Sequence, residues 1–237
     1  MPTTPSVSQR LHEAAEYLSV DFLGGPRPWK LSWIVNAQKG GMLPFLLWLA
    51  WWTGNQAPAA WTYLALHGGY GVVWVLKDVA FPDPRWQRRT TIAGGIASVA
   101  GVLGWYSAFG WLMFTRPTPD YPLPEPMWLA LCTLLCVVGV AVMIAADAQK
   151  TFTLRAKPGL ITDGMFRHVR HPNYAGEMMI YASFALLVQH WLPWVVLAAV
   201  WGLLFLPSLA AKERRMSRHP GWAEYRKRTW WLVPGLF

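Results

Sequence analysis

Long apolar segments recur along this chain of 237 residues and limit the folds open to it. Three clear segments and three less uniform ones can be drawn: about 31–52, 59–81, 91–114, 127–146, 175–189 and 191–209. Most approach the roughly 20 residues that a helix needs to cross a bilayer. Because 54% of the residues are hydrophobic and only 14% are charged, an ordinary soluble domain and a disordered chain are both disfavoured. We therefore predict an all-α, polytopic integral membrane protein with about six transmembrane helices.

Most basic residues gather in one set of connections between these segments. They lie before the first segment and in 77–89, 150–170 and 212–228, whereas the other connections contain only Arg116. Six helices with both termini in the cytoplasm place every basic block on one side, as the positive-inside rule requires. The net charge of +9 then follows from topology and requires no nucleic-acid partner.

We predict a single membrane domain over 1–237. Residues 1–30 lack the apolar core and cleavage site of a signal peptide, so an amphipathic N-terminal segment is expected there. Residues 31–146 would hold the first four membrane helices, and residues 147–237 the last two with a cytoplasmic tail. The predicted location is a multi-pass position in a bacterial inner membrane or the endoplasmic reticulum. The sequence does not indicate an oligomeric state.

The most polar stretch of the chain directly precedes a membrane segment. It is GMFRHVRHPNYAGE, over 164–177, and it supplies a cluster of basic side chains: Arg167, His168, Arg170 and His171. Guanidinium groups bind phosphate and carboxylate strongly. Two interpretations are open at this point: an anchor for lipid headgroups, or a binding site for an anionic ligand.

The residues that follow Pro172 favour the site. Asn173 and Glu177 lie four residues apart and therefore share one face of the next helix. A carboxylate near the start of a membrane helix is costly unless it is paired or functional. A lipid anchor requires neither of them, nor Tyr174, so we predict a functional site here.

A second polar cluster lies at the end of the fourth apolar segment. Asp147 and Lys150 are three residues apart on one helical face, and an acid near a helix C-terminus opposes the helix dipole. A partner for Asp147 is therefore expected, either Lys150 or a ligand hydroxyl. The following connection adds side chains that can cradle an anion: Arg155, Lys157, Arg167 and Arg170. No Gly-rich nucleotide loop and no Cys/His metal pattern is present, so no metal is expected.

The segment 59–81 carries polar residues where a bilayer disfavours them. His67, Tyr70 and Trp74 recur at helical spacing and share a face, in a region with three glycines in four residues. This face suits the wall of a lipid cavity. It equally suits plain helix packing through glycine, with His67 bonded to a neighbour.

Other residues of the apolar segments have simple structural interpretations. Lys77 and Asp78 are adjacent and point in different directions, so each is expected to have its own partner. Snorkelling to the interface is expected to account for Lys39. Cys132 and Cys136 lie four residues apart in one helix and are expected to remain free as small packing residues.

These motifs resemble the C-terminal half of the steroid 5-alpha-reductase and sterol C14-reductase superfamily. The similar stretches are Asp147-Ala-Gln-Lys150, Gly159-Leu-Ile-Thr-Asp-Gly164, Arg170-His-Pro-Asn-Tyr174-Ala-Gly-Glu177 and the tail through Val233-Pro234, all within 143–237. The resemblance implies NADPH bound between the last helices and the cytoplasmic loops. It also implies reduction of a carbon–carbon double bond in a flat, lipophilic small molecule. Residues 31–146 would then form the substrate side and 147–237 the cofactor side.

The resemblance also suggests roles for individual residues. The cofactor would contact Asp147, Lys150, Arg155, Arg167, Arg170, His171, Asn173, Lys212 and Glu213. Glu177 and Tyr174 would supply the proton or orient its donor. His67, Tyr70 and Trp74 would border the substrate. The expected protein is an NADPH-dependent oxidoreductase that acts on CH–CH groups, with its cofactor site facing the cytoplasm.

Two other functions stay open. Isoprenylcysteine carboxyl methyltransferases, together with phospholipid methyltransferases, are relatives that bind S-adenosylmethionine in a similar place. The isoprenylcysteine enzymes share the Arg-His-Pro-x-Tyr-x-Gly core, so that core does not separate the activities. Asn173 and Glu177 lean toward a reductase, whereas Lys212-Glu213 is similar to the methyltransferase acidic pair. The remaining possibility is a lipid-binding membrane protein without catalysis. A steroid ketone is disfavoured as substrate, because the Gln-Glu pair of the 5-alpha-reductases is missing and Gln56 is followed by Ala57.

Overall fold

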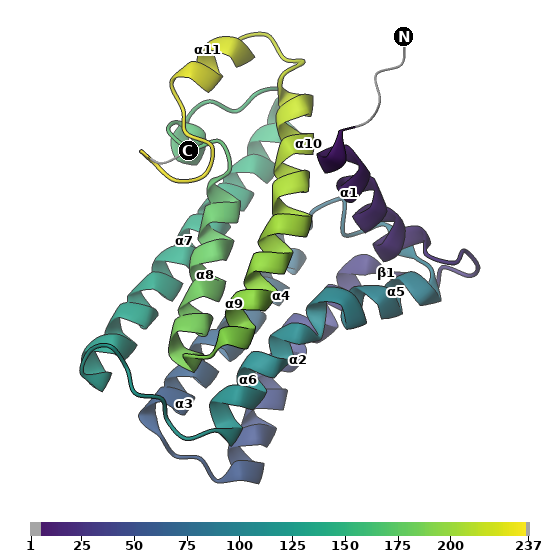
Figure 1. Ribbon diagram of the computed structural model, residues 1–237. Coiled ribbons are helices and arrows are strands. Elements are labelled where there is room, and N and C mark those ends of the chain that lie inside the picture. The colour runs from purple at the N-terminus through teal and green to yellow at the C-terminus, as the bar shows by residue number, and fades with distance from the viewer. Residues whose placement is uncertain (1–5, 236–237) are drawn as a thin grey trace.

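Six long helical stretches form the body of the computed structural model, which describes residues 6–235 (Figure 1). They are α2 (Leu31–Thr53); α3 (Pro58–Tyr63), η2 (Leu64–Gly68) and α4 (Gly69–Ala80); α5 (Ile92–Ser98), η3 (Val99–Leu103) and α6 (Trp105–Thr115); α7 (Glu125–Ala156); α8 (Pro172–Val188); and α9 (Trp191–Val200), η5 (Trp201–Phe205) and α10 (Leu206–Met216). The segments η2, η3 and η5 are single π-helical turns. Each apolar segment therefore forms a helix, and the prediction of a mostly helical fold is confirmed.

Local signals explain several helix boundaries. Pro172 occupies the first turn of α8, where its missing N–H costs nothing. The helix α4 ends at Ala80, directly before Phe81-Pro82. The helix α7 continues to Ala156, past the predicted helix end near Lys150, because no helix breaker occurs before Pro158. The cluster Asp147–Lys150 therefore lies inside a helix rather than at its end.

Within residues 6–235, two helices are long and apolar enough to cross a membrane: Glu125–Ala156 and Trp191–Met216. The pair Ile92–Leu103 and Trp105–Thr115, bent by 42°, makes a third if it crosses as one unit. The structure thus shows two to three candidate spans, fewer than the six predicted. The helices α2 and α3–α4 fall short because polar side chains interrupt their apolar sequence, and α8 falls short because it has only 17 residues.

Short elements cover the end of the bundle where the basic residues lie. The helix α1 (Val7–Glu16) begins with a capping box, in which Ser6 and Gln9 each bond the other's backbone, and continues into the π-helical turn η1 (Tyr17–Asp21). It packs against α10, and η1 packs against α5. The two-residue strands β1 (Trp29–Lys30) and β2 (Arg89–Thr90) pair antiparallel. Within the predicted amphipathic N-terminal segment, residues 7–21 are thus helical.

The C-terminal tail folds back onto the connection between α7 and α8. This connection contains a 3₁₀ turn, η4 (Gly164–Phe166), and the tail contains α11 (Trp222–Lys227). Trp230 exchanges backbone hydrogen bonds of 2.9 Å with His168 and Arg170. The tail is thereby fixed beside the start of α8.

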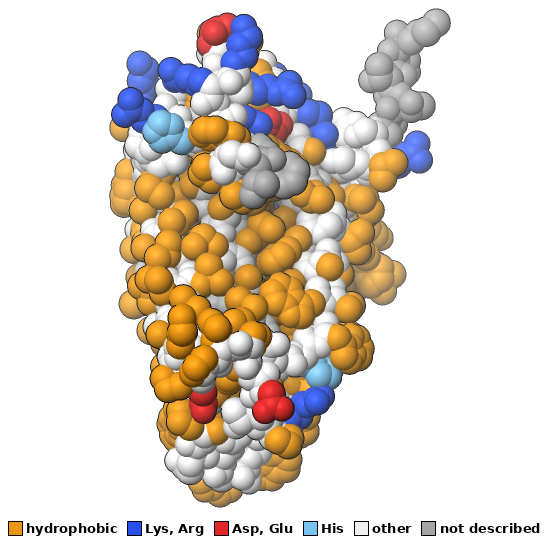
Figure 2. Space-filling model, turned by 60° about the vertical axis from the view of Figure 1, so that its left-hand side comes forward, with side chains coloured by type: hydrophobic (Ala, Val, Ile, Leu, Met, Phe, Trp, Pro, Cys, Tyr) orange, Lys and Arg blue, Asp and Glu red, His pale blue; other side chains and the backbone are white. Residues whose placement is uncertain are grey.

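Charge is distributed unevenly over the surface. Figure 2 shows most lysine and arginine side chains, with some acidic ones, gathered at one end, a broad belt of hydrophobic side chains below them, and a few charged groups of both signs toward the other end. The helices α1 and α11 both lie at the basic end (Figure 1). The basic blocks therefore share one end of the bundle, as the charge pattern predicts.

Glycines permit the close approach of the helices that carry polar groups. A Cβ atom on Gly176 would lie 2.6 Å from the carbonyl oxygen of Gly139 and 2.7 Å from the backbone nitrogen of Met143. A Cβ atom on Gly71 would overlap the carbonyl oxygen of Lys39. No side chain fits at either contact, so α8 lies directly on α7, and α4 directly on α2.

Candidate active site

A cavity of about 730 Å³ lies among these helices, on the side of the bundle toward its basic end. One part of its wall is polar and charged: Lys39, Lys77, Asp83, Arg85, Asp147, Lys150, Asn173 and Glu177. The other part is apolar and comes mainly from η3 and η5, with residues such as Val102, Leu103, Leu204 and Phe205. Residues of α1 and η1 border it as well.

The polar residues of α8 form a row that runs inward. Asn173, Glu177 and Tyr181 follow at intervals of four residues and all line the cavity. With a rise of about 1.5 Å per residue, Glu177 lies about 6 Å and Tyr181 about 12 Å deeper than Asn173. The cavity therefore extends from the basic end toward the middle of the bundle.

Asp147 is the centre of the outer polar group. Its carboxylate is paired with Lys77 of α4, lies 3.3 Å from the Lys150 ammonium and accepts a hydrogen bond of 3.1 Å from the Asn173 side-chain amide. Asp147 is only 7% exposed. Of the two partners considered for Asp147, the structure shows Lys150 and adds Lys77, so Asp147 joins three helices. Asp78 has separate partners in Asn36 and Gln87, as expected.

The loop after α4 extends this charged network. Asp83 lies 3.5 Å from the Lys150 ammonium and 3.6 Å from the Arg85 guanidinium. Burial alone would raise the pKa of Asp83, but these two cations outweigh it and lower the pKa to about 2. Asp83 is therefore ionised at any physiological pH, and Lys150 is held between two carboxylates.

Lys39 forms the inner polar group. Its ammonium donates hydrogen bonds to the hydroxyl oxygens of Tyr181 at 2.8 Å and Tyr70 at 2.9 Å. It lies 3.6 Å from the nearer carboxylate oxygen of Glu177 and 4.0 Å from the centre of the Trp74 ring. At 6% exposure Lys39 points into the bundle, so the snorkelling interpretation is wrong.

The family of the chain is decided by its C-terminal part. Residues 96–229, more than half of the chain, match the family described as "Protein of unknown function (DUF1295)". The chain belongs to the DUF1295 family. This family is part of the steroid 5-alpha-reductase superfamily, so the resemblance seen in the motifs is confirmed. The match begins at residue 96 and thus extends further upstream than the motifs within 143–237.

The curated proteins similar to this DUF1295 chain include a sterol reductase and an uncharacterized protein. A Delta(14)-sterol reductase of Mus musculus is 27% identical over 168 residues, which cover 60% of this chain and 39% of the reductase. An uncharacterized protein of Schizosaccharomyces pombe is 42% identical over 79 residues, which cover 33% of this chain and 27% of that protein. The chain thus spans well under half the length of these relatives. No solved structure matches it significantly.

The cofactor residues predicted from the sequence fall into separate places in the DUF1295 segment. Asp147, Lys150 and Asn173 line the cavity, together with the predicted catalytic residues Tyr174 and Glu177. The Lys212 ammonium lies 4.1 Å from the centre of the Tyr174 ring, just behind the cavity wall.

Arg170, His171 and Glu213 form a different cluster under the tail. Glu213 accepts hydrogen bonds from Arg170 at 2.8 Å and from His171 at 3.0 Å, and Arg170 also donates to the carbonyl oxygen of Thr229. Burial lowers the pKa of His171, against the opposing effect of Glu213. Arg170, buried by these contacts, ties the tail to the bundle and does not line the cavity.

Two further predicted cofactor residues, Arg155 and Arg167, are exposed and do not line the cavity. Of the residues predicted to border the substrate, Trp74 lines the cavity. Tyr70 does not, but its hydroxyl accepts a hydrogen bond from Lys39, which does. His67 stacks on Phe184 at 4.2 Å and shares a 2.6 Å hydrogen bond with Tyr63, so it serves helix packing.

Sequence reasoning missed several polar residues of the cavity wall, among them Lys39, Arg85 and Tyr181. A lysine inside an apolar segment, beside Gly40 and Gly41, was a usable signal for Lys39, because an intramembrane charge marks a functional site by default. The interval of four from Glu177 was the signal for Tyr181. Nothing local distinguishes Arg85 from the other arginines of its loop.

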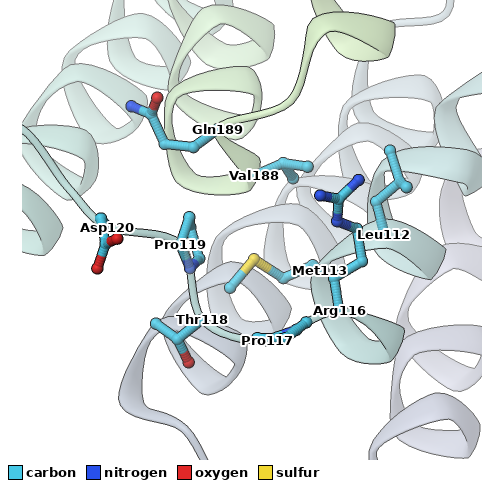
Figure 3. Close-up of a pocket in the computed structure, with 9 residues that line it drawn as sticks. All are labelled: Leu112, Met113, Arg116, Pro117, Thr118, Pro119, Asp120, Val188 and Gln189. Atoms are coloured by element: carbon cyan, nitrogen blue, oxygen red, sulfur yellow. The ribbon is translucent and has the colours of Figure 1, made fainter.

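A smaller pocket of about 220 Å³ lies at the opposite end of the bundle. Figure 3 shows Arg116 and Asp120 on the connection after α6, opposite Gln189 at the end of α8. Its walls carry neither a tyrosine nor a buried ion pair within the described residues. We therefore place the candidate site in the larger cavity.

Replacing Arg170 by alanine is expected to free the tail of this DUF1295 protein. The loss of charge-assisted hydrogen bonds to Glu213 and Thr229 costs about 1.5–3 kcal/mol, enough to raise tryptic cleavage near α11 at least about tenfold. The measurement is limited proteolysis in detergent, with the exposed Arg155→Ala as control. Equal cleavage of both variants would show that Arg170 does not fix the tail.

Proposed function

We propose that this protein is a membrane-embedded, NADPH-dependent reductase of a carbon–carbon double bond in a lipophilic substrate. The proposal rests on one cavity, which is charged at the basic end of the bundle and apolar between η3 and η5. The Tyr181 hydroxyl, the Lys39 ammonium and the Glu177 carboxylate lie close together in its wall. Such a cavity accommodates a charged nucleotide, a lipid and a proton donor together.

The polar wall suits the chemistry of a dinucleotide. NADPH supplies a hydride from its nicotinamide ring and carries three phosphate groups. Arg85, Arg88 and Lys150 would hold phosphate, and Asp147 and Asn173 would bind ribose hydroxyls or the nicotinamide amide. The described lining has five Lys or Arg residues and four Asp or Glu residues. This excess of positive charge favours an anionic cofactor over S-adenosylmethionine, which is a sulfonium cation.

The apolar wall suits a substrate that arrives from the bilayer. The turns η3 and η5 belong to two of the candidate membrane spans, and their residues line the cavity at that level. The similarity to a Delta(14)-sterol reductase supports a reductase rather than a methyltransferase. The carboxylate of Glu213, which would have to serve a methyltransferase, is already bound by Arg170 and His171.

We further propose that all six helices cross the membrane, with both termini and the polar mouth of the cavity in the cytoplasm. The placement of α1, α11 and the basic blocks at one end supports this topology (Figures 1 and 2). NADPH is then reached from the aqueous side and the lipid from the membrane side.

NADPH is expected to raise the melting temperature of the purified protein in detergent, whereas S-adenosylmethionine is expected to leave it unchanged. A ligand at a hundredfold excess over its Kd adds about 2.7 kcal/mol to the free energy of unfolding. Arg85→Ala should abolish the shift, and Arg155→Ala, exposed and outside the cavity, should retain it. Stabilisation by S-adenosylmethionine but not by NADPH would overturn the proposed function.

A further inference from the structure

The Lys39 ammonium has one hydrogen-bond donor more than it uses. An ammonium has three N–H donors, and two of them serve the hydroxyl oxygens of Tyr181 and Tyr70. The third faces Glu177, whose nearer oxygen is 3.6 Å away, beyond the roughly 2.7–3.2 Å of an N–H···O hydrogen bond. Lys39 lines the cavity, so a ligand oxygen can reach this donor.

Tyr181 has a donor free for the same place. Its oxygen accepts from Lys39, so its own O–H is left for another acceptor. Its ring stacks on Tyr106 at 4.3 Å, which fixes its orientation, and both tyrosines line the cavity. Tyr70 does not line the cavity, and its hydroxyl lies 3.8 Å from the sulfur of Met143, a weak acceptor. Tyr181 is therefore the hydroxyl that a ligand meets.

A buried ammonium in a membrane helix is costly and needs a reason. Packing does not supply one here, because an apolar side chain would fill the same space beside Trp74 and the two tyrosines without the desolvation penalty. Two converging donors beside a fixed positive charge form an arrangement that binds an oxygen atom on which negative charge develops.

We propose that Lys39 and Tyr181 bind a carbonyl oxygen of the substrate, so that the double bond that is reduced is conjugated to that carbonyl. The inference rests on the proposed reductase function and names the substrate class for the same cavity. A fixed ammonium stabilises the negative oxygen of an enolate. It would oppose the carbocation formed when an isolated double bond is protonated.

Reduction adds one hydride and one proton to the conjugated carbonyl compound. The β-carbon of the substrate gains the hydride, the carbon–carbon π bond breaks, and its electron pair moves through the carbonyl carbon onto the oxygen. Tyr181 gives its proton to this enolate oxygen, and Lys39 stabilises the phenolate left behind. The enol then becomes the saturated carbonyl compound. Tyr181 regains a proton from solvent along the polar row of Glu177 and Asn173. The substrate has gained two electrons and two hydrogens, and the nicotinamide is oxidised.

The test of the oxygen site needs no cofactor. The probe is β-naphthol, a flat phenol whose ionised form resembles an enolate and has its own absorption band. Wild-type protein in detergent at neutral pH is expected to bind it as naphtholate. Lys39→Met should weaken naphtholate binding at least tenfold, and Tyr181→Phe, which keeps the cation, should weaken it several-fold. Lys157→Met, at an exposed position outside the cavity, should have no effect.

Each outcome decides the proposal. If wild-type protein or Tyr181→Phe binds naphtholate no better than Lys39→Met, the oxygen site is refuted, while a NADPH thermal shift would leave the reductase function standing. If Lys39→Met does not fold, the comparison of Lys39→Arg with Tyr181→Phe decides whether the oxygen site exists. Retention of naphtholate binding by Lys39→Arg, but not by Tyr181→Phe, then supports the proposal. With NADPH added, an alkyl-substituted cyclohexenone should be reduced and the matching cyclohexene should not. Equal reduction of both would refute the substrate class.

Discussion

Replacing Gly176 by alanine is expected to separate α7 from α8 and to abolish binding of NADPH. The new Cβ atom would lie 2.6 Å from the Gly139 oxygen, 2.7 Å from the Met143 nitrogen and 3.1 Å from the Met143 Cα. These are backbone atoms, so no side-chain rotation can relieve the clash. Overpacking of this kind costs about 1–3 kcal/mol and sometimes more. The displacement also moves Asn173 and Glu177 away from the cavity wall that they share with α7.

The measurement is the unfolding midpoint in detergent, with and without NADPH. Gly69→Ala is the matched control, because a Cβ atom there has nothing within 4 Å and alanine favours a helix by about 1 kcal/mol over glycine. Gly69→Ala should be as stable as wild type or slightly more stable. If the two variants melted at the same temperature, the close contact between α7 and α8 would be wrong.

Asp147→Ala is expected to be the most destabilising charge removal in the described chain. It leaves the ammonium groups of Lys77 and Lys150 without their shared carboxylate, and it removes the acceptor of Asn173. Removing one partner from a buried ion pair costs about 3–5 kcal/mol, since the remaining charge stays desolvated. The free energy of unfolding in detergent should fall by this amount.

Two further variants separate charge from packing. Glu224→Ala removes an exposed acid whose pair with Lys227 is a surface contact, and it should cost less than about 1 kcal/mol. Adding Lys77→Met to Asp147→Ala should recover part of the loss, because the unpaired cation is then absent. A loss in Asp147→Ala no larger than that in Glu224→Ala would argue against a buried pair.

The helices were predictable because their signals are local. The apolar segments gave the helical stretches, and Pro172 and Phe81-Pro82 marked two boundaries within a residue or two. The number of membrane spans was harder to predict, because α2 carries polar side chains within its apolar sequence and α8 has only 17 residues. Hydropathy alone does not count such helices, and the charge pattern alone suggested six.

The site was predictable in part. Spacing placed Asp147 and Lys150 on one helical face and Asn173 and Glu177 on another, since residues three or four apart share a face, and all four line the cavity. Spacing did not show that Arg170 lies outside the cavity, because its partner Thr229 lies far along the chain. A motif shows which residues are neighbours in sequence, whereas the direction of a loop side chain depends on the segment that later folds over it.

The direction of the Lys39 side chain was likewise not predictable from its own helix. Whether a lysine near a helix end reaches outward or inward depends on how the helix is rotated, and α2 is rotated by its contact with α4. Gly71 lies against the Lys39 carbonyl oxygen and Tyr70 against its ammonium. Both belong to another segment, so the first segment alone could not indicate the direction.

The ion pairs of the cavity restrict how such a protein can diverge. Lys39–Glu177, Lys77–Asp147 and Lys150–Asp83 each join a residue before position 96 to a residue within the matched family segment. A substitution of one partner leaves the charge of the other unpaired, so the two residues of each pair must change together. Chimaeras that join the N-terminal part of one relative to the C-terminal part of another should therefore fold only when they preserve these pairs of partners.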